Sequence, residues 1–171
     1  MARANQKIRA YHFTGDKLRD ERPIPKPGEV LTHSGDIEIC STGLHGSRKP
    51  LDALRYAPGH HVHYVEMWGD VYEQSDKLVA RNRKILWSLD AEPTLRRFAC
   101  RCALDVLHLW DAPDIVVQYL KTGNESTRAA AGDAAGDAAW AAARDAARVK
   151  QNLRLVAMLH AAHKEGGERD D

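Results

Sequence analysis

The first half of the chain alternates short apolar stretches with turn-forming residues, a pattern typical of β-strands. Apolar and polar residues alternate in Lys7–Phe13, Ile37–Cys40 and His61–Trp68, and a glycine follows each of these segments within a few residues. These segments are also rich in β-branched and aromatic residues, which favour strands. We therefore predict three strands here. A fourth, half-exposed strand is expected over residues 77–87, with Val79, Ile85 and Trp87 on one face.

One short helix interrupts this β-rich half. Ser47 is a candidate N-cap residue, Pro50 would lie in the first turn, and Leu51 and Leu54 have helical spacing. Pro58-Gly59 would then stop the helix. We predict a helix between these signals.

In the second half of the chain the apolar period changes from two to nearly four, which predicts helices. The first should run from Glu92 to about Trp110, and a shorter one should span residues 114–120 and end at a glycine. An alanine-rich helix over residues 125–163 would be about 57 Å long if unbroken. We therefore expect two helices there, with a break at Gly132 or Gly136.

These elements together predict an α+β fold in two modules. Residues 1–90 should form a β-rich module with one short helix. Residues 91–165 should form an antiparallel, alanine-rich helical module, in which small side chains let helices approach closely. Residues 166–171 should be a charged tail, frayed from about Lys164.

Composition narrows the class of protein. The 171 residues include 25 Lys and Arg against 24 Asp and Glu, so the chain lacks the basic excess typical of nucleic-acid-binding proteins. No apolar run approaches the length of a membrane span, and no apolar segment of a signal peptide follows the N-terminus. We expect a cytoplasmic protein that does not bind membranes. Its three cysteines should be reduced, because an odd number makes a poor disulfide framework.

The most distinctive motif lies in the first half. Cys40-Ser41-Thr42-Gly43-Leu44-His45 precedes the short helix, which ends near Tyr56, and Val65-Glu66 with Gly69 follows. In the order and spacing of these residues, residues 7–86 resemble an uncharacterised domain family of phages and prophages. This resemblance implies an accessory protein of a phage, and it carries no activity with it.

The second half resembles helical domains named as immunity proteins. The resemblance rests on Arg96–Ala103, the alanine-rich stretch after it and Gln151-Asn152-Leu153. Together, the two resemblances imply a protein that inhibits another protein or gives immunity against it. Such fold-level analogy does not by itself establish function.

A metal site was weighed at the distinctive motif. Cys40 and His45 offer zinc-type ligands, with His60, His61 or His63 as further candidates. No Cys-x-x-Cys pair accompanies them, so we expect no metal and no cofactor. In the simpler interpretation Cys40 packs as a small buried side chain, and His45 hydrogen-bonds to the backbone of its turn.

An enzymatic alternative is an ADP-ribosyltransferase-like module that uses NAD. The resemblance consists of Tyr11-His12 on a first strand, Ser41-Thr42-Gly43 at the end of a later one, and Glu66 or Glu73 as the glutamate that orients the ribose. No full motif set is present. We therefore expect no catalytic residues and leave this activity as the alternative.

A basic run also needs an interpretation. Lys77, Arg81, Arg83, Lys84 and Trp87 follow one another closely, with Arg96 and Arg97 further on, and would suit phosphate or an acidic protein face. More commonly, such basic residues lie on strands and simply face the solvent. A nucleic-acid-associated accessory protein is therefore a further, less favoured alternative.

Our leading hypothesis is a phage- or mobile-element-encoded protein that binds and inhibits a host or competitor protein, such as a component of a host defence system of the CRISPR kind. We do not expect a small-molecule ligand. The candidate binding residues are His12, Cys40, His45, Lys77, Arg81, Arg83 and Trp87.

Overall fold

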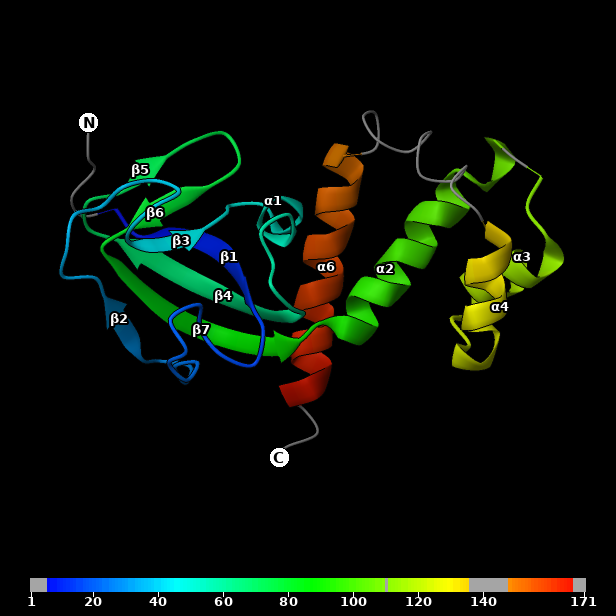
Figure 1. The fold of residues 1–171 in the computed structure, drawn as a ribbon, viewed down its shortest axis with the longest axis horizontal. Helices are drawn as coiled ribbons and strands as arrows, with labels where there is room; N and C mark the ends of the chain where they lie inside the picture. The colour runs from blue at the N-terminus through cyan, green and yellow to red at the C-terminus, as the bar shows by residue number, and fades with distance from the viewer. Residues whose placement is uncertain (1–5, 110, 136–147, 168–171) are drawn as a thin grey trace. The chain divides into compact units, whose positions relative to one another are not determined.

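Two antiparallel sheets form the N-terminal part of the chain (Figure 1). The computed structural model describes residues 6–109, 111–135 and 148–167. The larger sheet has the strand order β1-β4-β7-β2, and the smaller sheet has the order β3-β6-β5. The strands are β1 (Ile8–Thr14), β2 (Val30–Thr32), β3 (Leu44–Gly46), β4 (His61–Trp68), β5 (Tyr72–Glu73), β6 (Leu78–Ala80) and β7 (Asn82–Asp90).

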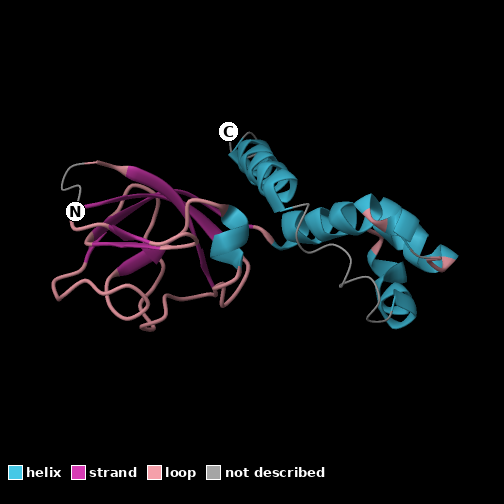
Figure 2. Cartoon of the chain, turned by 90° about the horizontal axis from the view of Figure 1, so that it is seen from above, coloured by secondary structure: helices cyan, strands magenta, loops and turns pink. Residues whose placement is uncertain are grey.

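Helices make up the C-terminal part, as the cartoon in Figure 2 shows, and the predicted α+β class is confirmed. The short helix α1 (Pro50–Leu54) was also predicted, but its N-cap residue is Lys49 and not Ser47, and no side chain caps it. The other helices are α2 (Glu92–Asp105), α3 (Asp114–Thr122), α4 (Glu125–Ala135) and α6 (Arg148–Gly167), with a 3₁₀ turn at Leu107–Leu109. Among the described residues, none of these helices combines the length and apolar character that a membrane span needs.

The chain divides into two compact units. One unit comprises Met1–Ala91 together with Leu159–Asp171, and the other comprises Glu92–Met158. The α6 helix therefore contributes its first part to the second unit and its last part to the first unit.

Alternation along the strands gives the larger sheet two different faces. One face carries Ile8, Ala10, Val65, Met67 and Ile85, which form a buried cluster with Leu78 and Ala80 of the smaller sheet. Gly46 of β3 allows this close approach, because a Cβ atom there would lie 2.8 Å from the sulfur of Met67. The two sheets are thus the layers of one core.

The opposite face of the larger sheet carries an aromatic cluster. Tyr64 and Trp87 stack with ring centroids 5.4 Å apart, and the Trp87 ring stacks on His163 of α6 at 4.7 Å. The hydroxyl of Tyr11 lies 3.1 Å from Nε2 of His160. The last part of α6 therefore packs on this face.

Two strand predictions were wrong. Residues 37–40 form a tight turn instead, because the N–H groups of Ser41 and Thr42 both donate to the carbonyl of Glu38 and Cys40 has a φ of 68°. The strand expected over residues 77–87 is divided at Arg81. The Arg81 backbone there donates to Gly69 and accepts from His33.

The helical predictions need smaller corrections. The first helix ends at Asp105 and gives way to the 3₁₀ turn, and Trp110 lies outside the described residues. The helix expected at 114–120 is α3, and Gly123 ends it in the left-handed conformation, as its position predicted. The α4 helix continues through Gly132, and Gly136 lies outside the described residues.

The last helix is longer than predicted. It was expected to end near His163, and α6 continues to Gly167. Residues 168–171, where most of the predicted charged tail falls, lie outside the described residues.

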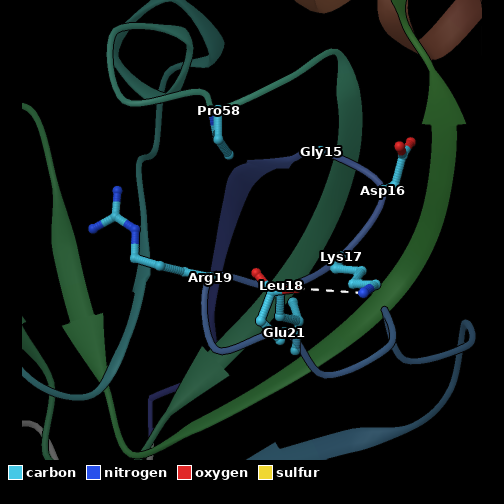
Figure 3. Close-up of a pocket in the computed structure, with 7 residues that line it drawn as sticks. All are labelled: Gly15, Asp16, Lys17, Leu18, Arg19, Glu21 and Pro58. Atoms are coloured by element: carbon cyan, nitrogen blue, oxygen red, sulfur yellow. Dashed lines mark hydrogen bonds and ion pairs between the residues drawn. The ribbon is translucent and has the colours of Figure 1, made fainter.

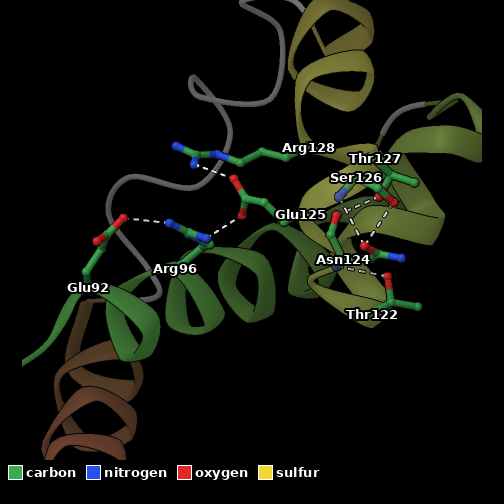
Figure 4. A network of polar contacts seen from close by, with 8 residues as sticks. All are labelled: Glu92, Arg96, Thr122, Asn124, Glu125, Ser126, Thr127 and Arg128. Carbon is green, nitrogen blue, oxygen red and sulfur yellow. Dashed lines mark hydrogen bonds and ion pairs between the residues drawn. The ribbon is translucent and has the colours of Figure 1, made fainter.

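Polar contacts join α2 to the start of α4 within the second unit (Figure 4). Arg96 pairs with Glu92 at 2.5 Å and with Glu125, and Glu125 also accepts from Arg128 at 2.9 Å. The side chain of Asn124 accepts from the N–H of Ser126 and so caps α4. Arg96 is therefore engaged by carboxylates and does not extend the basic run of the first half.

Candidate functional site

Two histidines and one arginine gather on the inner face of the larger sheet in the first unit. His12 of β1 and His63 of β4 are register partners, with ring centroids 6.2 Å apart. Arg83 of β7 is only 5% exposed, and its Nη1 donates to the backbone carbonyl of His45 at 2.7 Å. Its Nε is buried and has no hydrogen-bond partner among the described residues. We call the side chains of His12, His63 and Arg83 the buried cluster.

His63 is held by hydrogen bonds at both ring nitrogens. The Thr14 hydroxyl donates to the carbonyl of Gly15 at 2.9 Å, so at its 2.9 Å contact with His63 it must accept a proton from Nε2. Nδ1 of His63 then accepts from the Ser88 hydroxyl at 2.7 Å. His63 is therefore the neutral tautomer with its proton on Nε2.

Burial keeps the histidines of the cluster uncharged. It lowers the His63 pKa to about 4, with a further contribution from the nearby Arg83 cation. The same two causes hold the pKa of His12 well below its usual value. Burial also lowers the Arg83 pKa to about 10, so the guanidinium keeps its charge at neutral pH.

The buried cluster is thus one cation beside neutral imidazoles, with no carboxylate among its three members. An efficient general base has a pKa near the working pH, and a histidine with a pKa of about 4 is a weak one at neutrality. The Ser88–His63 contact resembles a nucleophile with its base, but this depressed pKa favours a structural role.

A continuous chain of contacts leads from the buried cluster to the surface. Nε2 of His45 accepts from the backbone N–H of Cys40 at 3.1 Å, which confirms the predicted bond between His45 and its turn. Cys40 itself is exposed, so the expectation that it is buried was wrong. Nζ of Lys77 donates to the Tyr56 hydroxyl at 3.2 Å, and interactions with the Cys40 thiol and with this hydroxyl raise the Lys77 pKa.

Where this series of contacts reaches the surface, charged side chains link the α1 region to the β5–β6 hairpin. The Tyr56 hydroxyl donates to Asp76 at 2.5 Å, and Nζ of Lys77 lies 4.9 Å from the centre of the Tyr56 ring. Tyr56 is nevertheless 45% exposed, and Tyr72 on β5 is 50% exposed. Arg48 pairs with Glu73, and Arg55 with Asp76 at 3.6 Å. We define the hairpin surface as Arg48, Arg55, Tyr56, Glu73, Asp76 and Lys77.

The structure thus brings together five of the seven candidate binding residues and separates the other two from them. The connected ones are His12, Arg83, His45, Cys40 and Lys77.

Arg81 and Trp87 lie elsewhere. Arg81 pairs with Asp70 at 2.6 Å. Leu86 has no partner in the β4–β7 ladder, and this bulge turns Trp87 to the opposite face from Ile85, contrary to the prediction that they share one. The basic run is therefore no continuous patch.

The transferase alternative needs His12 and a glutamate in one site. Glu66 is the register partner of Arg9 and pairs with it and with Lys7, which lowers the Glu66 pKa. His12 is three residues from Arg9 on the same strand and so points to the other face. Glu66 is therefore on the wrong side of the sheet, and Glu73 belongs to the hairpin surface.

A pocket lies beside the loop that follows β1 (Figure 3). Lys17 and Arg19 line it together with Asp16 and Glu21, and Lys17 pairs with Glu21 at 3.3 Å. Charges of both signs are balanced there, so the pocket favours neither an anion nor a cation.

Sequence reasoning named Tyr56 only as part of a motif and not as a binding residue, and it missed Ser88 and Asp90. The sequence gives only a weak indication of their roles. These roles depend on which residues meet in the folded protein and not on spacing along the chain. The metal-ligand candidates are also separated in the structure. Nε2 of His45 is occupied by Cys40, whereas His60 and His61 lie beside Asp90.

Comparison with known proteins identifies the family. Residues 8–97 match the model of a domain of unknown function, DUF7666, and the chain belongs to this family. The match spans both sheets and includes every candidate binding residue. It brings no phage or immunity assignment with it. No curated protein matches the chain. No solved structure matches it.

Proposed function

We propose that this chain is a non-catalytic protein that binds another protein through the hairpin surface and inhibits it. The observation that carries the proposal is an exposed tyrosine fixed in place by charged neighbours. Tyr56 keeps 45% of its surface exposed while its hydroxyl is bonded to Asp76 and its ring lies beside Lys77.

Tyrosine and arginine are the residue types that most often dominate the energy of protein interfaces. Side chains that are ordered before binding lose less conformational entropy when the partner arrives. The ion pairs of Arg48 and Arg55 provide such ordering within the hairpin surface.

The charge of the hairpin surface favours a protein over a nucleic acid. Its three cations, Arg48, Arg55 and Lys77, lie among the carboxylates of Glu73 and Asp76. A surface that follows a phosphate backbone needs an excess of cations. Mixed charge suits a partner protein with a complementary pattern.

The biological setting in this proposal comes from the resemblances in sequence. The Cys40–His45 motif resembles a phage domain family, and the helical part resembles immunity proteins. We therefore propose a host or competitor protein as the partner, in the host cell cytoplasm.

Affinity purification from the natural host, with a quantified partner, tests this function. We expect one stoichiometric protein to co-purify with the wild type. The double variant Tyr56→Ala/Lys77→Ala should bind it at least about thirtyfold more weakly, since a hot spot contributes about 2 kcal/mol or more.

The matched control is Val30→Ala/Lys84→Ala. It also removes one exposed apolar side chain and one lysine, from a register pair at the edge of the larger sheet. This control should bind as the wild type does. Equal binding by both double variants, or recovery of no partner above background, would contradict the proposal. Transfer of label from NAD to a target would instead favour the transferase alternative.

A further inference from the structure

A second cluster of polar side chains lies at the end of β7 that is farther from β2. His61 and Asp90 face each other across the β4–β7 ladder, and the N–H of Ala91 donates to the carbonyl of His60 at 3.0 Å. The backbone of all three residues is thus fixed by hydrogen bonds between the strand ends. Side chains on such rigid positions can form a site without reordering the chain.

The side chains of these residues converge. One ligand atom from each of His60, His61 and Asp90 lies within 4.8 Å of the other two. Nδ1 of His60 is 2.7 Å from a carboxylate oxygen of Asp90, and the two imidazole rings have centroids 4.9 Å apart.

One ring nitrogen of His61 is left without a hydrogen bond within the described part of the chain. Its Nδ1 is buried and has no hydrogen-bond partner among the described residues. Burying such a nitrogen without a partner is unfavourable. A ligand that approaches Nδ1 would remove this cost.

We propose that His60, His61 and Asp90 bind a divalent transition-metal ion of the zinc type. Two imidazole nitrogens and one carboxylate oxygen are ligands that such ions prefer, whereas magnesium and calcium prefer oxygen alone. The fourth position of a tetrahedral ion is left for water or for a group of a partner.

The distances fit this ion with a small adjustment. Ligands around a tetrahedral zinc ion, with bonds of about 2.0–2.1 Å, are about 3.3 Å apart. The atoms within 4.8 Å of one another therefore need to approach by about 1.5 Å at most, which side-chain rotation supplies. His60 and Asp90 already meet at 2.7 Å and open slightly to admit the ion.

Calorimetric titration of the full chain with Zn²⁺, and with Co²⁺ followed by absorption, tests this site. The wild type should bind one ion per chain, with the visible absorption bands of tetrahedral Co²⁺, and should not bind Mg²⁺. His61→Ala and Asp90→Asn should each weaken Zn²⁺ binding by about tenfold or more, a loss at least as large as removal of a supporting partner of a ligand.

His33→Ala is the control, because His33 lies near the opposite end of β7, beside Arg81. It should bind Zn²⁺ as the wild type does. Asp90→Asn retains the test if His61→Ala does not fold, since the Asp90 side chain is 55% exposed. Failure of the wild type to bind one Zn²⁺ ion, or unchanged binding in both ligand variants, would overturn the proposal. Neither outcome depends on the hairpin surface.

Discussion

The buried His63 should make the protein less stable as the pH falls from neutrality. Its pKa is about 4 in the folded protein, against an ordinary value of 6.5. The unfolded chain therefore takes up a proton near pH 6.5 and the folded protein does so only near pH 4. Stability is retained above pH 6.5 and is lost progressively between these values.

The size of this effect follows from the shift. Each unit of pKa difference corresponds to about 1.4 kcal/mol, so His63 should reduce the free energy of unfolding by about 2 kcal/mol between pH 7 and pH 5. Burial also lowers the pKa values of His12 and His45, which contribute with the same sign.

Urea denaturation at pH 7, 6 and 5 measures the effect. His63→Gln retains hydrogen-bonding capacity and cannot titrate, so it should lose about 2 kcal/mol of the pH dependence of the wild type. The reasoning is refuted if His63→Gln shows the same pH dependence as the wild type, or if the wild type becomes more stable towards pH 5.

Two further predictions concern the first unit. Arg83→Met removes a cation that lowers the His63 pKa, so NMR titration should find a higher pKa for His63 in this variant; a lower or unchanged value would contradict the geometry of the buried cluster. Gly43→Ala should cost at least about 1–3 kcal/mol in chemical denaturation, because Gly43 has a φ of 104° and a Cβ atom there would lie 2.6 Å from a methyl group of Val79. Gly15→Ala is the control, since a Cβ atom at Gly15 meets nothing within 4 Å and its φ is not in the left-handed region; equal losses at both glycines would count against the account.

Local patterns were sufficient for the regular elements. Strands β1 and β4 follow from alternation over seven or eight residues, and the end of α3 follows from Gly123. Each of these signals lies within the element that it predicts.

The wrong predictions depended on distant partners. Arg81 interrupts a strand because its backbone pairs with Gly69 and His33. Trp87 changes face because Leu86 is unpaired in a ladder with β4. Neither the interruption at Arg81 nor the bulge at Leu86 can be predicted from the neighbouring residues in the sequence.

The candidate site, too, could be predicted only where its residues are neighbours in the sequence. Cys40 and His45 were recognised as one motif because they are neighbours in sequence. Their connection to Lys77 and Tyr56 exists only after the β5–β6 hairpin meets the end of α1. Residues that meet across sheets could not be grouped from spacing alone.

The most direct test of the proposed function is site-specific photo-crosslinking in the natural host. A photoreactive phenylalanine analogue is placed at Tyr56 in one protein and at Val30, on the edge strand β2, in another. Both positions are similarly exposed, at 45% and 49%, so both analogues can react with a neighbouring protein. We predict one defined crosslinked protein from position 56 and none from position 30. The same crosslink from both positions, or none from position 56, would contradict binding through the hairpin surface.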